Sequence, residues 1–168
     1  PFRIIVSTQD TIGLGLKIKK AFDFAENLEN QLSDYRSLSA VSQINSLAGK
    51  SIFYPIQSEF KEILLESIRA KKLTDGALNV FSGKLVKEWR KTRANQLLPD
   101  SLQMVKISRE ISGECVAFSE DSLSIRLLNE SCQLDFGSIG KGFAAQKVMN
   151  YLVQMGLPYV MVDAGGKI

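Results

Sequence analysis

The hydrophobic positions of the chain recur with two periods, one typical of β-strands and one typical of amphipathic helices. Short apolar runs at 2–7 and 159–162 predict strands. Two further runs, 115–118 and 123–127, flank the polar turn 119–122 and predict a hairpin. Strands are therefore expected near both ends of the chain, and a hairpin in its second half.

Apolar residues spaced three and four positions apart predict five helices between these strands. The predicted ranges are 18–34, 40–47, 58–73, 83–93 and 139–155. Ser58 is the expected N-cap of the third helix, which ends at the Thr-Asp-Gly turn 74–76. Pro99 and Asp100 predict a short helical turn, and Gly156 is the expected C-cap of the last helix.

Composition restricts the class of protein. The chain has 168 residues, about one domain, and its 45% hydrophobic and 23% charged residues are ordinary for a globular protein. No apolar run approaches the roughly 20 residues of a membrane helix. The net charge is only +3 and is evenly divided between the two halves, which argues against a nucleic-acid partner.

Particular residue types restrict the chemistry. The chain contains no histidine, which excludes Ser-His-Asp and Cys-His mechanisms and imidazole metal ligands within it. Its two cysteines, Cys115 and Cys132, are too few for a disulfide scaffold or a zinc ribbon, and we expect both to be free thiols in the core. The basic residues of the predicted helix 83–93 are expected to form a solvated face, with a phosphate-binding or partner-binding patch as the alternative.

The most informative segment is 134–143, which reads Leu-Asp-Phe-Gly-Ser-Ile-Gly-Lys-Gly-Phe. A predicted short strand at 133–135 brings Asp135 to its end, a glycine-rich turn follows, and a helix begins with Lys141 in its first turn. Glycines allow close approach of the backbone, and the unpaired N–H groups of a helix start attract anions. The segment therefore predicts a phosphate-binding turn beside a carboxylate.

Two other kinds of segment combine glycines with a lysine in this way, a P-loop and a tight turn without a ligand. A P-loop requires four residues between its glycines and a Ser or Thr after the Lys. Here only two residues separate Gly137 from Gly140, and Gly142 follows Lys141, so both requirements fail. A tight turn with a solvated lysine and no ligand stays open on the local pattern alone.

Segment 135–145 (D-F-G-S-I-G-K-G-F-A-A) resembles the signature of the ApbE-type FAD:protein FMN transferases, whose usual form is D-L-G-G-I-A-K-G-Y-A. Three other blocks follow the order of that family. They are L-S-D-Y-R-S-L-S at 32–39, followed by Ile44-Asn45, then T-D-G-A-L-N at 74–79 and V-D-A-G-G at 162–166. The four ordered blocks span essentially the whole chain, so the resemblance is more specific than any one block.

The resemblance implies a set of site residues. FAD would be held by Tyr35, by Ala77, Leu78 and Asn79, by Asp135 and by Lys141, while Ser138 would offer an oxygen to Mg2+. A tyrosine can stack on a flat ring system, and a carboxylate can accept hydrogen bonds from ribose or amino groups. A lysine at a helix start can hold a pyrophosphate. An oxygen-only shell suits magnesium.

The implied reaction is the Mg2+-dependent transfer of FMN from FAD to a Thr or Ser hydroxyl of a partner flavoprotein, a subunit of a redox complex, with release of AMP. No residue is identified as the base, so the catalytic residue stays unknown. Asn79, Gln146 and Lys167 stand where the family has acids. A weakly active or inactive flavin-binding paralogue and a Mg2+-dependent FAD pyrophosphatase therefore stay open as alternatives.

The resemblance also implies an α+β fold of the T-fold-like ApbE type, with a mixed, largely antiparallel sheet packed by helices. The predicted order of elements agrees with it. We expect residues 1–168 to form a single domain that is incomplete at both termini, because both ends fall next to predicted strands. From the family alone, we expect a bacterial cell-envelope location, with membrane contact only through a lipid anchor outside this chain.

Overall fold

The computed structural model describes residues 2–165 and divides the chain into two compact units. The first unit combines residues 1–31 with 137–168, and the second is the continuous segment 32–136. Both mix helices with antiparallel strands, which confirms the predicted α+β class. No helix in the described part has the length and hydrophobicity needed to cross a bilayer. The prediction of a single domain stays a prediction.

The sheet of the first unit pairs the two ends of the chain. Strands β1 (Phe2–Val6) and β5 (Val160–Ala164) are antiparallel, with Phe2 opposite Ala164. Both strands alternate between more buried and more exposed residues, so the sheet presents one face to the core. The two terminal strands predicted from the apolar runs are thereby confirmed.

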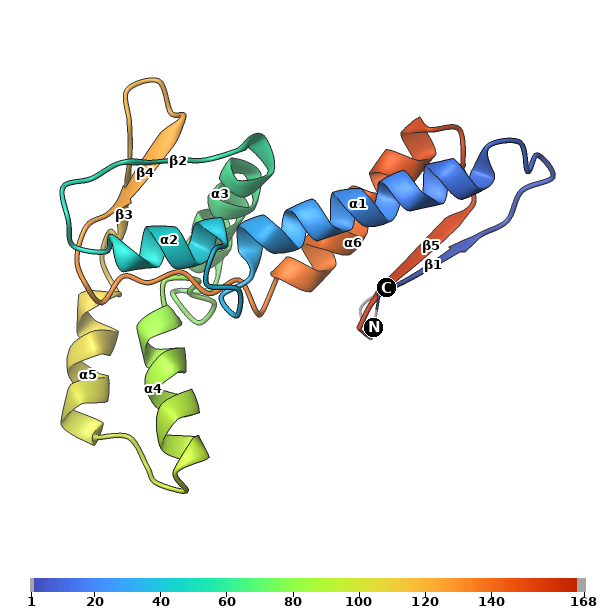
Figure 1. Ribbon diagram of the computed structural model, residues 1–168. Coiled ribbons are helices and arrows are strands. Elements are labelled where there is room, and N and C mark those ends of the chain that lie inside the picture. The colour runs from blue at the N-terminus through green and yellow to red at the C-terminus, as the bar shows by residue number, and fades with distance from the viewer. Residues whose placement is uncertain (1, 166–168) are drawn as a thin grey trace. The chain divides into compact units, whose positions relative to one another are not determined.

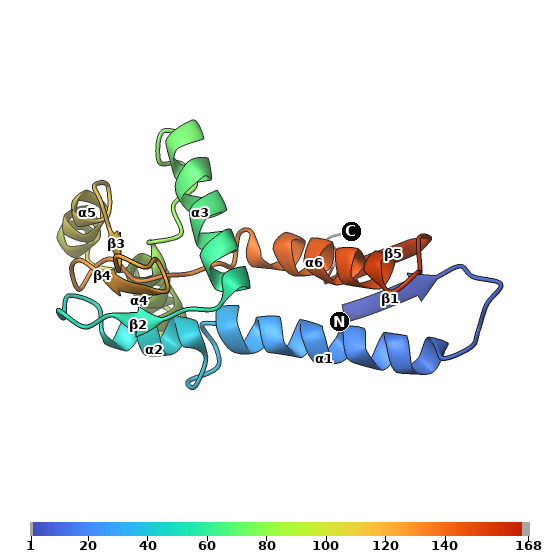
Figure 2. The ribbon, with the colours of Figure 1, turned by 90° about the horizontal axis from the view of Figure 1, so that it is seen from above.

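Two long helices cover this sheet face. Helices α1 (Leu14–Leu32) and α6 (Gly140–Gln154) lie alongside each other and against the strand pair (Figures 1 and 2). Their contact residues are small or aliphatic and form one core with β5: Ala21, Leu28, Ala145, Val148, Leu152, Leu157, Val162 and Ala164. Gly156 follows α6 with a φ of 82°, which confirms its predicted role in ending the helix.

The second unit contains a three-stranded antiparallel sheet in the order β2-β4-β3. Strands β3 (Val116–Phe118) and β4 (Ser124–Leu127) form the predicted hairpin. Strand β2 (Tyr54–Pro55) adds to the other edge of β4 and was not predicted. A two-residue strand that contains a proline has no alternation that a sequence pattern could reveal.

Four helices complete the second unit: α2 (Ala40–Ser46), α3 (Ser58–Leu73), α4 (Gly83–Ala94) and α5 (Ser101–Glu110) (Figure 1). The predicted cap of α3 was wrong, because Ser58 is its first helical residue and donates its hydroxyl to Glu59. Helix α5 is longer than the predicted short turn. Its N-cap is Asp100, whose carboxylate accepts hydrogen bonds from Leu102 N and Gln103 N.

The expectation of two free thiols was wrong. Cys115 and Cys132 form a disulfide, with Cα atoms 5.3 Å apart, and both residues are buried. The hairpin explains how residues 17 positions apart meet. It returns the chain so that Leu128 N donates to Cys115 O at 3.0 Å, and the next turn brings Cys132 beside Cys115.

Candidate functional site

Asp135 lies in the segment that the sequence predicted to be a strand, and that prediction was wrong. Residues 133–135 form no ladder, and their only β-contact is a single parallel bridge between Ser82 and Gln133. The segment is instead held by separate hydrogen bonds, one of which joins Asp135 N to Val80 O at 2.7 Å. Asp135 is 8% exposed, so its carboxylate is brought into the fold without a sheet.

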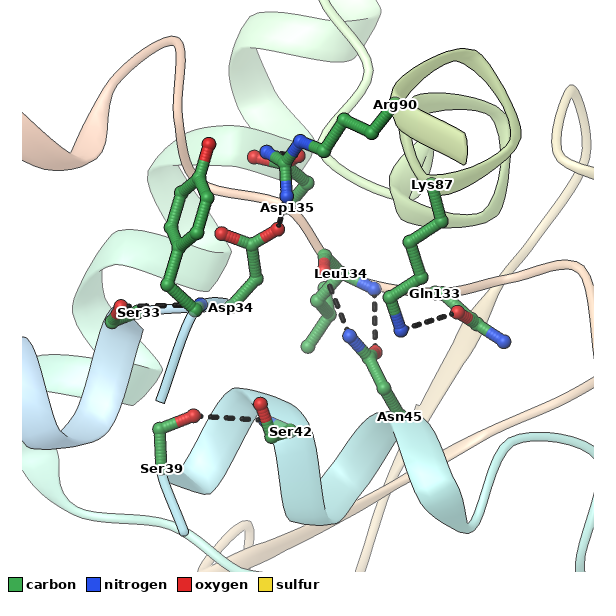
Figure 3. A network of polar contacts seen from close by, with 11 residues as sticks. Ser33, Asp34, Ser39, Ser42, Asn45, Lys87, Arg90, Gln133, Leu134 and Asp135 are labelled. Carbon is green, nitrogen blue, oxygen red and sulfur yellow. Dashed lines mark hydrogen bonds and ion pairs between the residues drawn. The ribbon is translucent and has the colours of Figure 1, made fainter. Parts of the chain in front are cut away.

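Asn45 fixes the residue before Asp135. Its side-chain Nδ2 donates to Leu134 O at 2.9 Å, and its Oδ1 accepts from Leu134 N at 2.7 Å (Figure 3). Asn45 is itself buried in α2. The amide therefore replaces a β-partner for one residue, satisfying both polar groups of a buried peptide segment.

Gly83 allows α4 to begin against this segment. Its N–H donates to Gln133 O at 2.7 Å. A Cβ atom on Gly83 would lie 2.7 Å from Gln133 O and 2.8 Å from Leu134 O. Only glycine permits such a close approach of two backbones, so the start of α4 and the segment before Asp135 are locked together.

The basic residues of α4 form the predicted solvated face only in part, because Lys87, Lys91 and Arg93 are exposed whereas Lys84 and Arg90 are partly buried. Lys84 reaches Ser131 Oγ at 3.4 Å, and Lys87 donates to Gln133 Oε1 at 2.9 Å. Arg90 reaches further along the same segment, to Asp135 (Figure 3). Three basic side chains at successive turns therefore hold the segment that leads to the candidate site, while Lys91 is exposed.

Arg90 connects the residues that the resemblance singled out. Its Nη1 donates to Asp34 Oδ2, and its Nη2 donates to Asp135 Oδ2 at 3.3 Å. Its guanidinium carbon lies 4.4 Å from the centre of the Tyr35 ring. Burial lowers the pKa of Arg90, but the hydrogen bond and charge of Asp34 and the charges of Tyr35 and Asp135 raise it, leaving it above its ordinary value. The guanidinium therefore stays charged throughout the physiological range.

Two predicted site residues, Tyr35 and Asp135, are thus brought together in the second unit. Tyr35 is 80% exposed, although one side of its ring contacts Arg90, whereas Asp135 is buried. A flat, accessible aromatic ring beside a buried, charge-paired carboxylate can take a planar ligand with polar substituents.

The stretch 77–79 follows the turn after α3 and ends one residue before Val80. Asn79 is bound into the fold at both ends of its amide, since Nδ2 donates to Ile111 O at 3.1 Å and Oδ1 accepts from Phe81 N at 3.0 Å. The next residue, Val80, provides the carbonyl that receives Asp135 N. The stretch is therefore linked to Asp135 through the backbone.

Ser138 and Lys141 belong to the first unit. Both are exposed, and Lys141 lies in the first turn of α6, as the sequence predicted. Their relation to Tyr35 and Asp135 stays a prediction. Gln146 is exposed and donates to Asn150 Oδ1 at 2.9 Å, while Lys167 lies outside the described residues. Within residues 2–165 no cluster of three or more His, Cys, Asp or Glu side chains could hold a metal ion.

Arg90 and Asp34 were missed as site residues. The two are 56 positions apart, and nothing in the helical pattern of α4 distinguishes Arg90 from its basic neighbours. The only sequence signal was that Asp34 precedes Tyr35 within the block 32–39. Their pairing is a product of the tertiary fold.

Comparison with known proteins places this arrangement in context. The model of the ApbE family matches residues 2–168. The chain is 27% identical over 150 residues to an FAD:protein FMN transferase of Klebsiella pneumoniae, covering 89% of this chain and 47% of that protein. It is 29% identical over 147 residues to one of Vibrio cholerae, covering 85% and 42%. The chain thus spans about half the length of the curated relatives it matches.

Solved structures show the same fold. A variant of the flavin transferase ApbE from Vibrio cholerae matches with a TM-score of 0.84 at 25% identity, covering 98% of this chain and 56% of that one. The ApbE protein of Thermotoga maritima matches with a TM-score of 0.82 at 20% identity, covering 98% and 53%. The α+β architecture of this chain is therefore shared with those proteins.

Proposed function

The chain belongs to the ApbE family, and on that premise we propose that the protein containing it transfers FMN from FAD to a Thr or Ser hydroxyl of a partner flavoprotein. The relatives named FAD:protein FMN transferase support flavin transfer as the activity. The identity of the partner as a subunit of a redox complex is part of the same proposal.

One observation of the chain itself carries this proposal. The exposed Tyr35 ring and the buried Asp135 carboxylate share one guanidinium, that of Arg90. A tyrosine ring that is held from one side and accessible from another can stack on an isoalloxazine or adenine ring. The carboxylate beside it can accept hydrogen bonds from the sugar or amino groups of the same ligand.

The proposed reaction is a phosphoryl transfer. The acceptor hydroxyl oxygen forms a bond to the phosphorus on the FMN side of the pyrophosphate, and the bond from that phosphorus to the bridging oxygen breaks. AMP leaves with the bridging oxygen, and the hydroxyl proton passes to a base that we do not assign to this chain. Positioning and charge neutralisation dominate such reactions, and Lys141 at the start of α6 is the cation that we propose for the pyrophosphate.

Magnesium enters the proposal through the chemistry of the pyrophosphate. When bound, the ion would neutralise charge on the phosphate oxygens. Ser138 is the one ligand that we propose from this chain, and the described residues contain no acidic cluster that completes a metal shell. The remaining ligands would come from other parts of the protein, so no step is assigned to the ion here.

A second function is favoured by Asn79. Both ends of its amide are bonded within the fold, and its Nδ2 donates to Ile111 O, which an ionised carboxylate cannot do. The hydrogen bonds around residue 79 match an amide, whereas the resemblance predicts an acid at this position. This favours a flavin-binding paralogue that binds FAD and transfers FMN weakly or not at all.

The disulfide supports an oxidising location. Disulfides persist in secreted and periplasmic proteins and are rare in the reducing cytosol. The pair Cys115 and Cys132 therefore agrees with the cell-envelope location that we propose, in which membrane contact would come only through a lipid anchor.

The test is to incubate the full-length protein with FAD, Mg2+ and a candidate acceptor, then to measure AMP by chromatography and the mass of the acceptor. Transfer predicts equal amounts of AMP and flavinylated acceptor, and loss of both when the metal is chelated. AMP formed without an acceptor would instead identify a pyrophosphatase. Bound flavin without AMP would identify the paralogue, and no flavin binding would overturn all three.

A matched pair of variants connects this test to the site. Asp135→Asn removes the buried carboxylate and should weaken FAD binding at least tenfold, which is about 1.4 kcal/mol. Asp23→Asn makes the same change at an exposed position of α1 and should leave binding unchanged.

A further inference from the structure

We propose that Arg90 is a positioning residue that sets Tyr35 and Asp135 in the arrangement that receives FAD. The inference rests on the proposed function, because it assigns a role at the same site. It assigns Arg90 to the binding of the flavin nucleotide, although Arg90 is not among the residues that the resemblance identified.

The geometry requires an arginine. The two terminal nitrogens of one guanidinium donate to carboxylates on different segments, Asp34 and Asp135 (Figure 3). The carbon of the same group lies 4.4 Å from the centre of the Tyr35 ring. A planar fork can donate in two directions and contact an aromatic face at the same time, whereas a lysine ammonium is a single charged point. Arg90 therefore makes three contacts that a lysine in its place would not reproduce.

Burial makes these contacts strong enough to set positions. The side chains of Asp34 and Asp135 are only 10% and 8% exposed. The charge of one guanidinium in contact with both carboxylates offsets the repulsion between them. Because the guanidinium contacts both carboxylates, replacing it changes the surroundings of the Asp135 carboxylate directly.

The ring of Tyr35 depends on the same side chain. Tyr35 follows α1 in a segment without regular structure, and its N–H donates to Ser33 Oγ at 3.3 Å. Because the ring is 80% exposed, little besides the guanidinium restricts its orientation. Contact on one side of the ring leaves the rest of it accessible to a flat ligand.

The experiment compares Arg90→Lys with Arg93→Lys in the full-length protein. Both changes are conservative and lie on α4, but Arg93 is exposed. Arg90→Lys keeps the charge between the two carboxylates, so the protein should fold. The readouts are the FAD dissociation constant, the quenching of flavin fluorescence on binding, and the urea midpoint of unfolding.

We expect Arg90→Lys to weaken FAD binding about tenfold and to reduce the quenching, while Arg93→Lys changes neither. In a Tyr35→Leu background, Arg90→Lys should weaken FAD binding less than in the wild type. The reason is that Tyr35→Leu already removes the ring, which is one of the two groups that Arg90 positions. A urea midpoint equal to that of Arg93→Lys would show that the effect is positional and not a general loss of stability.

Three results would overturn the inference. Equal FAD affinity in wild type and Arg90→Lys would remove Arg90 from the site while leaving the proposed function intact. A full effect of Arg90→Lys in the Tyr35→Leu background would show that Arg90 does not act through the ring. Wild-type protein that binds no FAD would overturn both the inference and the proposed function.

Discussion

At the scale of the residue, Asn45 shows how one amide can replace a strand partner. It is 5% exposed and satisfies both polar groups of Leu134. Asn45→Leu would leave a buried N–H and a buried C=O without partners, and should lower the free energy of unfolding by about 2–4 kcal/mol. Urea denaturation measures the change. The control is Asn150→Leu, which removes only an exposed hydrogen bond to Gln146 and should change the free energy of unfolding by no more than about 0.5 kcal/mol. Equal losses of stability in the two variants would contradict the role of Asn45.

Gly83 is required because the backbone of residues 133 and 134 leaves no room for a Cβ atom at this position. In Gly83→Ala the new Cβ would meet two backbone carbonyl oxygens at 2.7 and 2.8 Å, and neither can move as a flexible side chain would. We expect a loss of about 1–3 kcal/mol in the free energy of unfolding. Gly15→Ala is the control, because a Cβ there meets nothing within 4 Å and alanine favours the helix α1. It should be neutral or stabilising in the same urea experiment.

Lys71 links stability to pH. Its Nζ donates to Ile111 O and Gly113 O, and burial lowers its pKa below the ordinary value of 10.5. Between the folded pKa and 10.5 the unfolded chain binds more protons, so the free energy of unfolding contributed by Lys71 rises with pH in that window. The difference between wild type and Lys71→Met should therefore grow in favour of wild type as pH approaches 10.5. Urea denaturation of both proteins at a series of pH values measures this difference, and a difference that does not change with pH would contradict the prediction.

At the scale of the element, the disulfide joins the start of β3 to the segment that carries the site. Cys132 lies three residues before Asp135, and its partner Cys115 lies between α5 and β3. A cross-link that closes a loop of 17 residues should stabilise the fold by about 3 kcal/mol in the chain-entropy description. The double variant Cys115→Ser/Cys132→Ser should unfold at lower urea, and reductant should shift only the wild type. A wild type insensitive to reductant at the urea midpoint would contradict the prediction.

Helix α4 shows that an amphipathic pattern does not predict which residues the polar side chains of a helix will contact. Its bounds agree with the predicted range, but its basic side chains were assigned to solvent because helical spacing alone placed them away from the apolar face. The structure turns Lys87 and Arg90 toward Gln133 and Asp135. Long basic side chains reach partners on another segment, and no local pattern records where that segment passes.

At the scale of the whole molecule, the second unit is continuous in sequence, whereas the first is built from both ends of the chain. The second unit has its own sheet and its own disulfide. We therefore expect residues 32–136 expressed alone to unfold cooperatively in urea, as followed by near-ultraviolet circular dichroism. Residues 1–31 alone should show no such transition, because the core of the first unit needs α6 and β5. A non-cooperative transition in 32–136 would contradict the prediction.

The sequence by itself determined the class of fold, most helices and strands, and the blocks that led to the family. Helical spacing and apolar runs depend on local burial, so α2, α3, α4, α6, β1 and the hairpin were predicted with bounds close to those observed, while α1 begins four residues before its predicted start. The glycine-rich turn and the lysine after it could be predicted from the sequence because the residues that define this pattern are consecutive. Asp135 was identified for the same reason, whereas Tyr35 was identified only through the resemblance to the family.

Only the tertiary structure decided how those residues are held. The pairing of Arg90 with Asp34, of Asn45 with Leu134 and of Cys115 with Cys132 joins positions far apart in the chain. Each pairing depends on the path of the folded backbone. The identity of a single polar residue does not indicate which distant residue it will contact. For the same reason the short strand expected at 133–135 became a segment held by side chains, because neighbouring amides and cations took the place of a strand partner.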